Sequence, residues 1–240
     1  MLLLDIHSHI LPCVDDGAKS LEESIELLEM LKSQGVTDVV ATPHFYPHIQ
    51  SAEEFLQSRQ EAYNKLKDAI KDKDLPKVHI GCEMFYYDDM GKIGDIKSFT
   101  IENSPYILVE LSMTDVTKRV VETIENMCDT GYIPIMAHIE RYLQFRGIKG
   151  ILKLIAEGKC LAQVNASSIV SVKNNRKILK LIKAGYIYIL GSDAHSAKER
   201  PPFIKEALDV IERKIGHQYK NRMIINSGKL CRKIFGDDYE

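Results

Sequence analysis

The feature that most constrains this chain is a series of short β-rich runs, each followed by a segment with helical periodicity. Seven such runs occur along the 240 residues, and no Pro- or Ser-rich linker separates them. Regular alternation of strand and helix is typical of one α/β domain built on a parallel sheet. The runs are Leu2–Ile6, Asp38–Ala41, Val78–Cys82, Ile107–Leu111, Ile133–Ala137, Leu161–Val164 and Ile187–Leu190.

The helical segments carry start and stop signals. Ser20 with Glu23, and Ser51 with Glu54, have the spacing of capping boxes, and apolar residues then recur at helical spacing. Glycine is favoured just past the end of a helix, where the backbone turns left-handed. Helix ends are therefore predicted at Gly35, Gly131, Gly158, Gly185 and Gly216.

The number of units favours a barrel. Seven strand–helix units fill about the length of a (β/α)₈ barrel, so we expect a barrel that is incomplete. Met223–Asn226 is a candidate for a further short strand. A doubly wound open sheet is the competing architecture, but no G-x-G-x-x-G fingerprint follows the first run.

Residues that can bind a metal follow nearly every run. The carboxyl ends of barrel strands converge on one mouth, so these side chains should meet there. Each alone could be a surface or packing residue, but solvated residues have no reason to recur at every strand end. For Asn165 we expect either a hydrogen-bonding role or a turn. In chain order the set is His7, His9, His44, Glu83, Glu110, His138, Asn165, Asp193 and His195.

The spacing within this set adds detail. Side chains two apart lie on the same face of a strand, so His7 and His9 can bind one ion, and Asp193 and His195 repeat the spacing. Imidazoles and carboxylates without thiolates suit Mn²⁺, Fe²⁺ or Zn²⁺ and do not choose among them. The remaining candidates follow no run and should be surface or packing residues, namely His48, His79 and His217.

Composition excludes several classes of protein. The chain has 32 basic and 34 acidic residues and a formal charge of −2, so it lacks the excess of positive charge that is typical of nucleic-acid-binding proteins. No apolar run reaches the length of a membrane span, so no membrane insertion is expected. Five scattered cysteines without a C-x-x-C pair indicate reduced thiols in a cytoplasmic protein. None has arginine six positions later, which excludes the C-x5-R loop of cysteine-based tyrosine phosphatases.

Six motifs together resemble one known family. They are H-S-H at His7–His9, D-D-G at Asp15–Gly17, A-T-P-H at Ala41–His44, H-I-E-R-Y at His138–Tyr142, S-D-A-H at Ser192–His195 and R-P-P at Arg200–Pro202. The resemblance, over nearly the full chain, is to the bacterial protein-tyrosine phosphatases of capsular and exopolysaccharide operons. These belong to the polymerase and histidinol phosphatase (PHP) superfamily.

This resemblance implies a single PHP-type metallophosphatase domain over residues 1–240, folded as a distorted seven-stranded TIM-like (β/α)₇ barrel. It implies three divalent metal ions, often manganese. As substrate it implies the phosphorylated tyrosine-rich tail of a bacterial tyrosine kinase that controls polysaccharide export.

The resemblance also divides the ligands among the metals. Asp16 is expected as a ligand in preference to Asp15 because it directly precedes Gly17. Arg141 and Arg200 match arginines that contact the substrate phosphate, and this role is favoured over the alternative of a surface ion pair. The implied sets are His7, His9, Glu83 and Asp193 for one metal, Asp16, His44 and His195 for a second, and Glu110, His138 and a bridging Glu83 for the third.

The expected reaction is hydrolysis of phosphotyrosine by a metal-bound hydroxide, without a covalent phosphoenzyme. A histidinol-phosphate phosphatase or other PHP phosphoesterase is the main alternative, followed by an amidohydrolase or TatD-like nuclease. A non-catalytic metal-dependent regulator should lack some ligands, and none is missing here. No residue stands out as a general acid, so leaving groups with the acidity of a phenol, pKa about 10, should be preferred.

Overall fold

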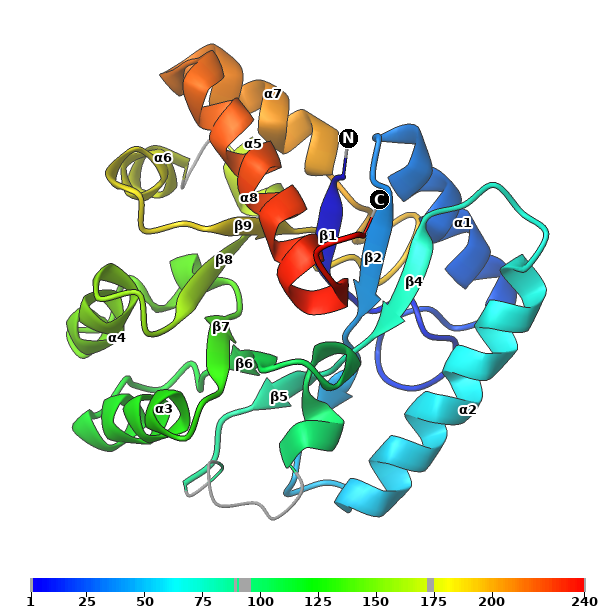
Figure 1. Ribbon diagram of the computed structural model, residues 1–240, viewed down its shortest axis with the longest axis horizontal. Coiled ribbons are helices and arrows are strands. Elements are labelled where there is room, and N and C mark those ends of the chain that lie inside the picture. The colour runs from blue at the N-terminus through cyan, green and yellow to red at the C-terminus, as the bar shows by residue number, and fades with distance from the viewer. Residues whose placement is uncertain (1, 89, 91–95, 172–174, 240) are drawn as a thin grey trace.

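The strands in the described part of the chain all pair in parallel and form a curled sheet with helices around it (Figure 1). The computed structural model describes residues 2–88, 90, 96–171 and 175–239. The second and third predicted runs each continue past a break as another short strand. The strands in the described residues are β1 (Leu4–Ser8), β2 (Asp38–Ala41), β3 (His44–Phe45), β4 (Lys77–Ile80), β5 (Glu83–Phe85), β6 (Tyr106–Glu110), β7 (Ile133–Met136), β8 (Leu161–Asn165) and β9 (Ile189–Gly191).

The sheet curls until its last strand meets its first. One part has the order β1-β2-β4 and the other β3-β5-β6-β7-β8-β9. Only two residues separate β2 from β3, and only two separate β4 from β5, so the chain runs directly from one part of the sheet into the other. His9 N donates to Ala194 O at 2.9 Å and Asp193 N donates to His7 O at 2.8 Å, which joins the segment after β9 to β1. The predicted distorted (β/α)₇ barrel is therefore confirmed.

Helices connect most of the strands and pack outside them. At the first helix Ser20 Oγ accepts from Glu23 N at 3.2 Å, and at the second Ser51 and Glu54 complete both arms of a capping box. The helices are α1 (Leu21–Ser33), α2 (Ala52–Ile70), α3 (Lys118–Asp129), α4 (Ile148–Ala156), α5 (Ala166–Val170), α6 (Asn175–Ala184), α7 (Ile204–Ile215) and α8 (His217–Phe235), with 3₁₀ turns η2 (Ile96–Phe99), η3 (Ile101–Asn103) and η4 (Ile139–Tyr142).

The predicted helix ends are confirmed, and one predicted strand is wrong. The backbone is left-handed at each predicted end, with φ of +83°, +94°, +74°, +87° and +117° at Gly35, Gly131, Gly158, Gly185 and Gly216. Met223–Asn226 lies inside α8. Both sides of β1, against which α8 packs, are already occupied, by β2 and by the segment after β9.

The C-terminal helix α8 packs against β1 and β9, and Figure 1 shows it in front of the sheet next to β1. Its Leu230, Cys231 and Ile234 form an apolar cluster with strand residues such as Leu4 and Ile135. A larger apolar cluster joins the other helices to the outside of the sheet. Among the described residues, none of the helices is both long and apolar enough to span a membrane. The apolar clusters fix the strands, and the strands fix the positions of the polar residues at their carboxyl ends.

Candidate metal centre

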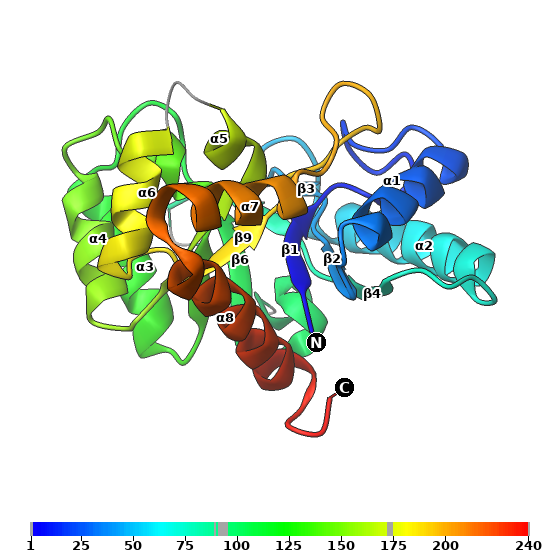
Figure 2. The same ribbon diagram turned by 90° about the horizontal axis from the view of Figure 1, so that it is seen from above.

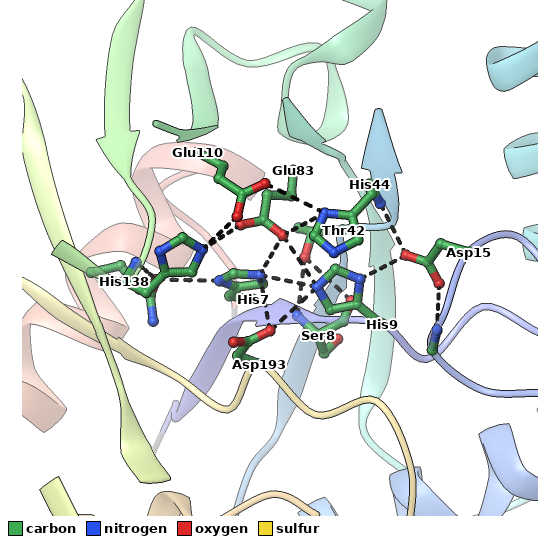
Figure 3. A network of polar contacts seen from close by, with 12 residues as sticks. His7, Ser8, His9, Asp15, Thr42, His44, Glu83, Glu110, His138 and Asp193 are labelled. Atoms are coloured by element: carbon green, nitrogen blue, oxygen red, sulfur yellow. Dashed lines mark hydrogen bonds and ion pairs between the residues drawn. The ribbon is translucent and has the colours of Figure 1, made fainter. Parts of the chain in front are cut away.

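The side chains predicted as metal ligands converge at the carboxyl ends of the strands (Figure 3). The Nε2 atoms of His7 and His9, at the end of β1, lie 3.1 Å apart. Glu83 Oε2 lies 3.1 Å from the first and 3.3 Å from the second. Asp193 Oδ1 lies 3.6 and 3.5 Å from the same two atoms. His7, His9 and Asp193 thus place one donor atom each within 4.8 Å of one another, and Glu83 adjoins the two imidazoles of this group.

The second expected group forms beside the first. Asp16 Oδ1 lies 3.6 Å from His44 Nε2 and 3.4 Å from His195 Nε2. His9 belongs to this group as well, since one donor atom of each of the four residues lies within 4.8 Å of the others. The side chain of Asp16 is 67% exposed, whereas that of His195 is buried. Asp16 therefore lies at the open mouth of the centre.

The third expected group surrounds Glu83. Its Oε1 lies 2.8 Å from His138 Nε2, which is 3.4 Å from Glu110 Oε1. Its other oxygen faces His7 and lies 3.0 Å from His44 Nδ1. Glu83 thus lies between the first and third groups, where the resemblance implies a bridging carboxylate.

Four imidazoles turn Nε2 toward the centre and hold Nδ1 against an oxygen. Where that oxygen accepts the Nδ1 proton, Nε2 keeps its lone pair, which is the form that binds a metal. The four contacts are His7 with Gln163 Oε1 (3.2 Å), His9 with Asp15 Oδ2 (2.7 Å), His138 with Tyr142 OH (3.1 Å) and His195 with Asp193 O (3.0 Å).

This arrangement fits divalent cations. The Nε2 atoms of His7 and His9 face each other across 3.1 Å, and in the tautomer that binds a metal their lone pairs would repel without a cation between them. His195 Nε2 is buried and has no hydrogen-bond partner among the described residues. Nitrogen and carboxylate donors of this kind suit Mn²⁺, Fe²⁺ and Zn²⁺.

The electrostatics of the cluster point the same way. Burial alone would lower the pKa of His138, but Glu110 and Glu83 raise it to about 9. Burial alone would raise the pKa of Asp193, but His7 and His9 hold it well below its usual range. The carboxylates therefore stay ionised and attract positive charge, which a proton or a metal ion can supply.

Strained backbone positions two of the donors. His138 and Asp193 have φ of +31° and +51°, in the left-handed region that residues other than glycine seldom adopt. Gln163 Oε1 holds His138 N at 2.7 Å, and His7 O holds Asp193 N at 2.8 Å. Gly17 packs so closely that a Cβ there would lie 2.2 Å from His9 O. Only glycine fits there, and this tight turn places Asp16 at the mouth.

Both arginines singled out in the sequence reach the centre. Arg141 Nη2 lies 2.7 Å from Asp193 Oδ2, and Arg200 Nη2 lies 3.1 Å from Asp193 Oδ1. Their second amino groups lie farther away, 3.9 Å from Glu110 and 4.0 Å from Asp16. The two side chains are 36% and 44% exposed. The guanidinium groups can therefore meet a ligand that enters from solvent.

The two adjacent aspartates have different surroundings. Asp15 is buried behind His9 and accepts from His9 Nδ1 at 2.7 Å, from His44 N at 2.9 Å and from Gly17 N at 2.9 Å. Burial would raise its pKa, but the charge and hydrogen bond of His9 hold it well below the usual range. Asp16 faces the mouth instead, so Asp15 orients an imidazole while Asp16 is placed as a donor.

Residues behind the donors complete the site. Asn165 Nδ2 donates to Asp193 Oδ2 at 2.6 Å, so of its two expected roles it has the hydrogen-bonding one. Gln163 was missed, although a polar residue two before Asn165 in an apolar strand was a usable signal. Tyr142 and Tyr46 were also missed. Tyr46 lies two residues after His44 and donates to Glu110 Oε2 at 3.3 Å.

The residues expected elsewhere do lie elsewhere. His48, His79 and His217 belong to none of the three donor groups. Burial raises the pKa of Cys82 and Cys160 to about 12. Thiols this weakly acidic stay protonated and are poor nucleophiles, in agreement with the missing C-x5-R loop.

Known proteins resemble this chain over almost its whole length. Residues 3–232 match the family described as "Capsular polysaccharide synthesis, CpsB/CapC". The chain is 31% identical to the tyrosine-protein phosphatase CpsB of Streptococcus agalactiae serotype III, with 96% of this chain and 98% of that protein covered. It is 30% identical to the tyrosine-protein phosphatase CpsB of Streptococcus pneumoniae, with 98% and 99% covered.

A solved structure agrees with the sequence relatives. It comes from work on YwqE of Bacillus subtilis and CpsB of Streptococcus pneumoniae, described as unique metal-dependent tyrosine phosphatases. The TM-score is 0.85 at 29% identity, with 96% of this chain and 95% of that chain covered.

Proposed function

The chain belongs to the CpsB/CapC family of capsular polysaccharide synthesis, and from this membership we propose that it is a metal-dependent protein-tyrosine phosphatase. One observation carries the proposal: nine imidazole and carboxylate side chains and two arginines meet at one open mouth of the barrel. A phosphate monoester is a dianion that such a site attracts through both metal ions and guanidinium groups.

We propose that the site holds three divalent ions, manganese in the first place, with iron and zinc as ions that the same donors accept. When bound, such ions act as Lewis acids toward the phosphate and make water more acidic. The donors assigned to them are His7, His9, Glu83 and Asp193 for one ion, Asp16, His44 and His195 for the second, and Glu110 and His138 with Glu83 for the third.

Arg141 and Arg200 bind the phosphate in this proposal. Arg141 contacts Asp193 Oδ2 and Arg200 contacts Asp193 Oδ1, and both side chains are partly exposed. A phosphate at the mouth can therefore bind an amino group of each guanidinium. The hydrogen bond from Asn165 Nδ2 to Asp193 Oδ2 is kept when the phosphate binds. The arginines thus add positive charge on the solvent side of the site and orient the phosphate.

A place for the tyrosine ring lies beside Arg141. A cavity of about 320 Å³ there includes Met113, Leu143 and Ile178 among its lining residues. An aromatic ring can lie against these apolar side chains while its phosphate reaches the guanidinium. The proposed partner is the phosphotyrosine-bearing tail of a bacterial tyrosine kinase that regulates capsular or exopolysaccharide synthesis, in the cytoplasm.

The test is a side-by-side assay of phosphotyrosine peptide, phosphoserine peptide and histidinol phosphate with Mn²⁺. Phosphotyrosine should give the highest kcat/KM, because no described residue is placed as a strong general acid and a phenol of pKa about 10 leaves more readily than an alcohol. Chelation should abolish the reaction until Mn²⁺ is restored. Equal or faster hydrolysis of histidinol phosphate would assign the chain to the other PHP phosphoesterases, and full activity without metal would refute the mechanism.

A further inference from the structure

A groove of about 680 Å³ lies between α6 and α7, apart from the metal centre. Figure 2 shows the two helices side by side, with α5 near one end of them. Apolar side chains line the groove, and two of them, Leu179 and Val210, are only 7% and 8% exposed. Val170 and Ile215 extend this apolar lining. The groove therefore offers a concave apolar surface.

The rim of the groove is strongly basic. No acidic residue lines it among the described residues, although acids outnumber bases in the chain by two. None of the basic side chains on the rim forms an ion pair or hydrogen bond with a residue that the structure describes. The rim residues are Arg176, Lys180, Lys183, Arg213 and Lys214, and all five are exposed.

Two of the three acidic residues of α7 are paired away from this rim, and the third, Glu206, does not line the groove. Asp209 Oδ1 and Glu212 Oε2 lie 3.0 and 2.7 Å from Lys220 Nζ of α8. These carboxylates are therefore paired on the α8 side of the helix. Arg213 and Lys214, on the same helix, are left to line the groove with the cations of α6. The charged side chains that line the groove among the described residues are therefore all basic.

We infer that this groove binds an acidic polypeptide segment whose carboxylates alternate with apolar side chains. The apolar side chains would cover the partly exposed lining, and the carboxylates would meet the five cations of the rim. Unpaired surface cations are often simply solvated, but here they surround a concave apolar surface from two helices. An anionic membrane is a poorer match, because a flat lipid surface cannot reach the floor of a groove. The inference does not depend on the proposed phosphatase activity.

Fluorescence anisotropy tests the inference directly. The probe is a fluorescein-labelled peptide in which glutamates alternate with leucines and phenylalanines, titrated with the full metal-loaded chain. Binding should saturate and should weaken as salt is raised, since exposed charges are screened. The triple variant Lys180→Glu, Lys183→Glu, Arg213→Glu should bind at least about tenfold more weakly.

A matched variant separates the groove from net charge. Lys65→Glu, Lys71→Glu, Lys73→Glu makes the same charge change on and just after α2, which lies across the molecule from α6 (Figure 1). It should bind the probe within about twofold of the native chain. Both variants should keep native hydrolysis of p-nitrophenyl phosphate, which reports that the barrel and its metals are intact. If the groove variant fails to fold, single reversals at Lys183 and at Arg213 replace it.

Any of the following results would overturn the inference. The first is no saturable binding of the acidic probe by the native chain. The second is an equal loss of binding in the α2 variant, or equal binding of a probe with lysine in place of glutamate. The third is cosedimentation with phosphatidylglycerol vesicles, reduced by the groove variant, without binding of the peptide, which would make the surface a membrane contact.

Discussion

Two clusters of histidine and aspartate lie in this molecule, and their geometry is opposite. At the carboxyl ends of the strands, four imidazoles turn Nε2 toward a common centre. Toward the start of the strands, His79 of β4 places Nε2 3.1 Å from Asp38 Oδ1 of β2. Tyr239 donates to the same carboxylate, and Phe235 stacks on the imidazole at 3.7 Å between ring centroids.

The comparison shows that residue type does not distinguish a metal site from a structural one. In the Asp38 cluster the His79 imidazole and the Tyr239 phenol both form a hydrogen bond with the Asp38 carboxylate, and the Phe235 ring stacks on the imidazole. In the larger cluster the Nε2 atoms of His7 and His9 lie 3.1 Å apart, and His195 Nε2 has no hydrogen-bond partner among the described residues. The direction of Nε2, and the oxygen that holds Nδ1, make the difference.

The largest effect is expected from a change in the larger cluster. His138→Ala removes an imidazole that lies 2.8 Å from Glu83 and 3.4 Å from Glu110. We expect loss of bound metal and a fall in kcat/KM of more than about 100-fold. Elemental analysis and kinetics on phosphotyrosine peptide measure both, and thermal unfolding checks the fold. A folded variant with full metal content and native rate would remove His138 from the site.

The strands, and the convergence of the predicted metal ligands, were accessible from the sequence for the same reason. In a parallel barrel the carboxyl ends of the strands meet, so residues far apart in the chain could be assigned to one place. Strand Asp38–Ala41 was predicted with the correct bounds, and the other runs were located to within a few residues. The prediction failed at Met223–Asn226, because apolar runs of that length also occur in helices such as α8.

The residues behind the donors were harder to predict because their role depends on rotamers and backbone direction. Asp15 and Asp16 are chemically identical neighbours, and only the turn at Gly17 sends one behind His9 and the other to the mouth. Gln163 contacts His7 and the His138 amide across strands, which no local pattern encodes. The groove between α6 and α7 depends on how two helices pack and was likewise beyond the sequence pattern.

A smaller effect is expected behind the metal ligands. Asp15→Ala removes the acceptor that lies 2.7 Å from His9 Nδ1. The imidazole can then rotate or change tautomer, and metal affinity should fall about 10- to 100-fold. Asp15→Asn keeps an oxygen at this position and should recover part of the loss. Competition with a metal indicator measures the affinity, and unchanged affinity in both variants would show that Asp15 only stabilises the loop.

The arginine variants should separate substrate binding from metal binding. Arg200→Ala should keep its metals and lose roughly 2 kcal/mol of transition-state stabilisation, which is about 30-fold in kcat/KM. Arg141→Ala should behave alike, because both guanidinium groups contact Asp193 and face the mouth. Inhibition by inorganic phosphate should weaken in parallel. Native kinetics in both variants would mean that the two arginines are surface ion pairs.

The smallest effect on catalysis is expected at the second histidine cluster. His79→Ala is the matched counterpart of His138→Ala, and it should keep native metal content and change kcat/KM by less than about twofold. Its cost should instead be stability, about 2 kcal/mol of unfolding free energy, because Asp38 is 1% exposed and loses a hydrogen-bond partner. Urea denaturation of chelator-treated protein measures this without interference from the metals. Loss of metal or of activity in a stable His79→Ala protein would break the distinction between the two clusters.

The pH dependence of that stability loss gives a sharper test. Burial alone would raise the pKa of Asp38, but hydrogen bonds from His79, Thr37 and Tyr239 lower it below its usual value. A carboxyl group with a lowered pKa in the folded state contributes stability that is present above its unfolded pKa of about 3.9 and is lost as the pH falls through the folded pKa. Removing His79 reduces this shift, so the difference in stability between the native chain and the variant should be largest well above about pH 3.9 and should shrink as the pH falls below it, through the folded pKa. A difference that stays constant from neutral to acid pH would assign the loss to the stacking on Phe235 rather than to the Asp38 carboxylate.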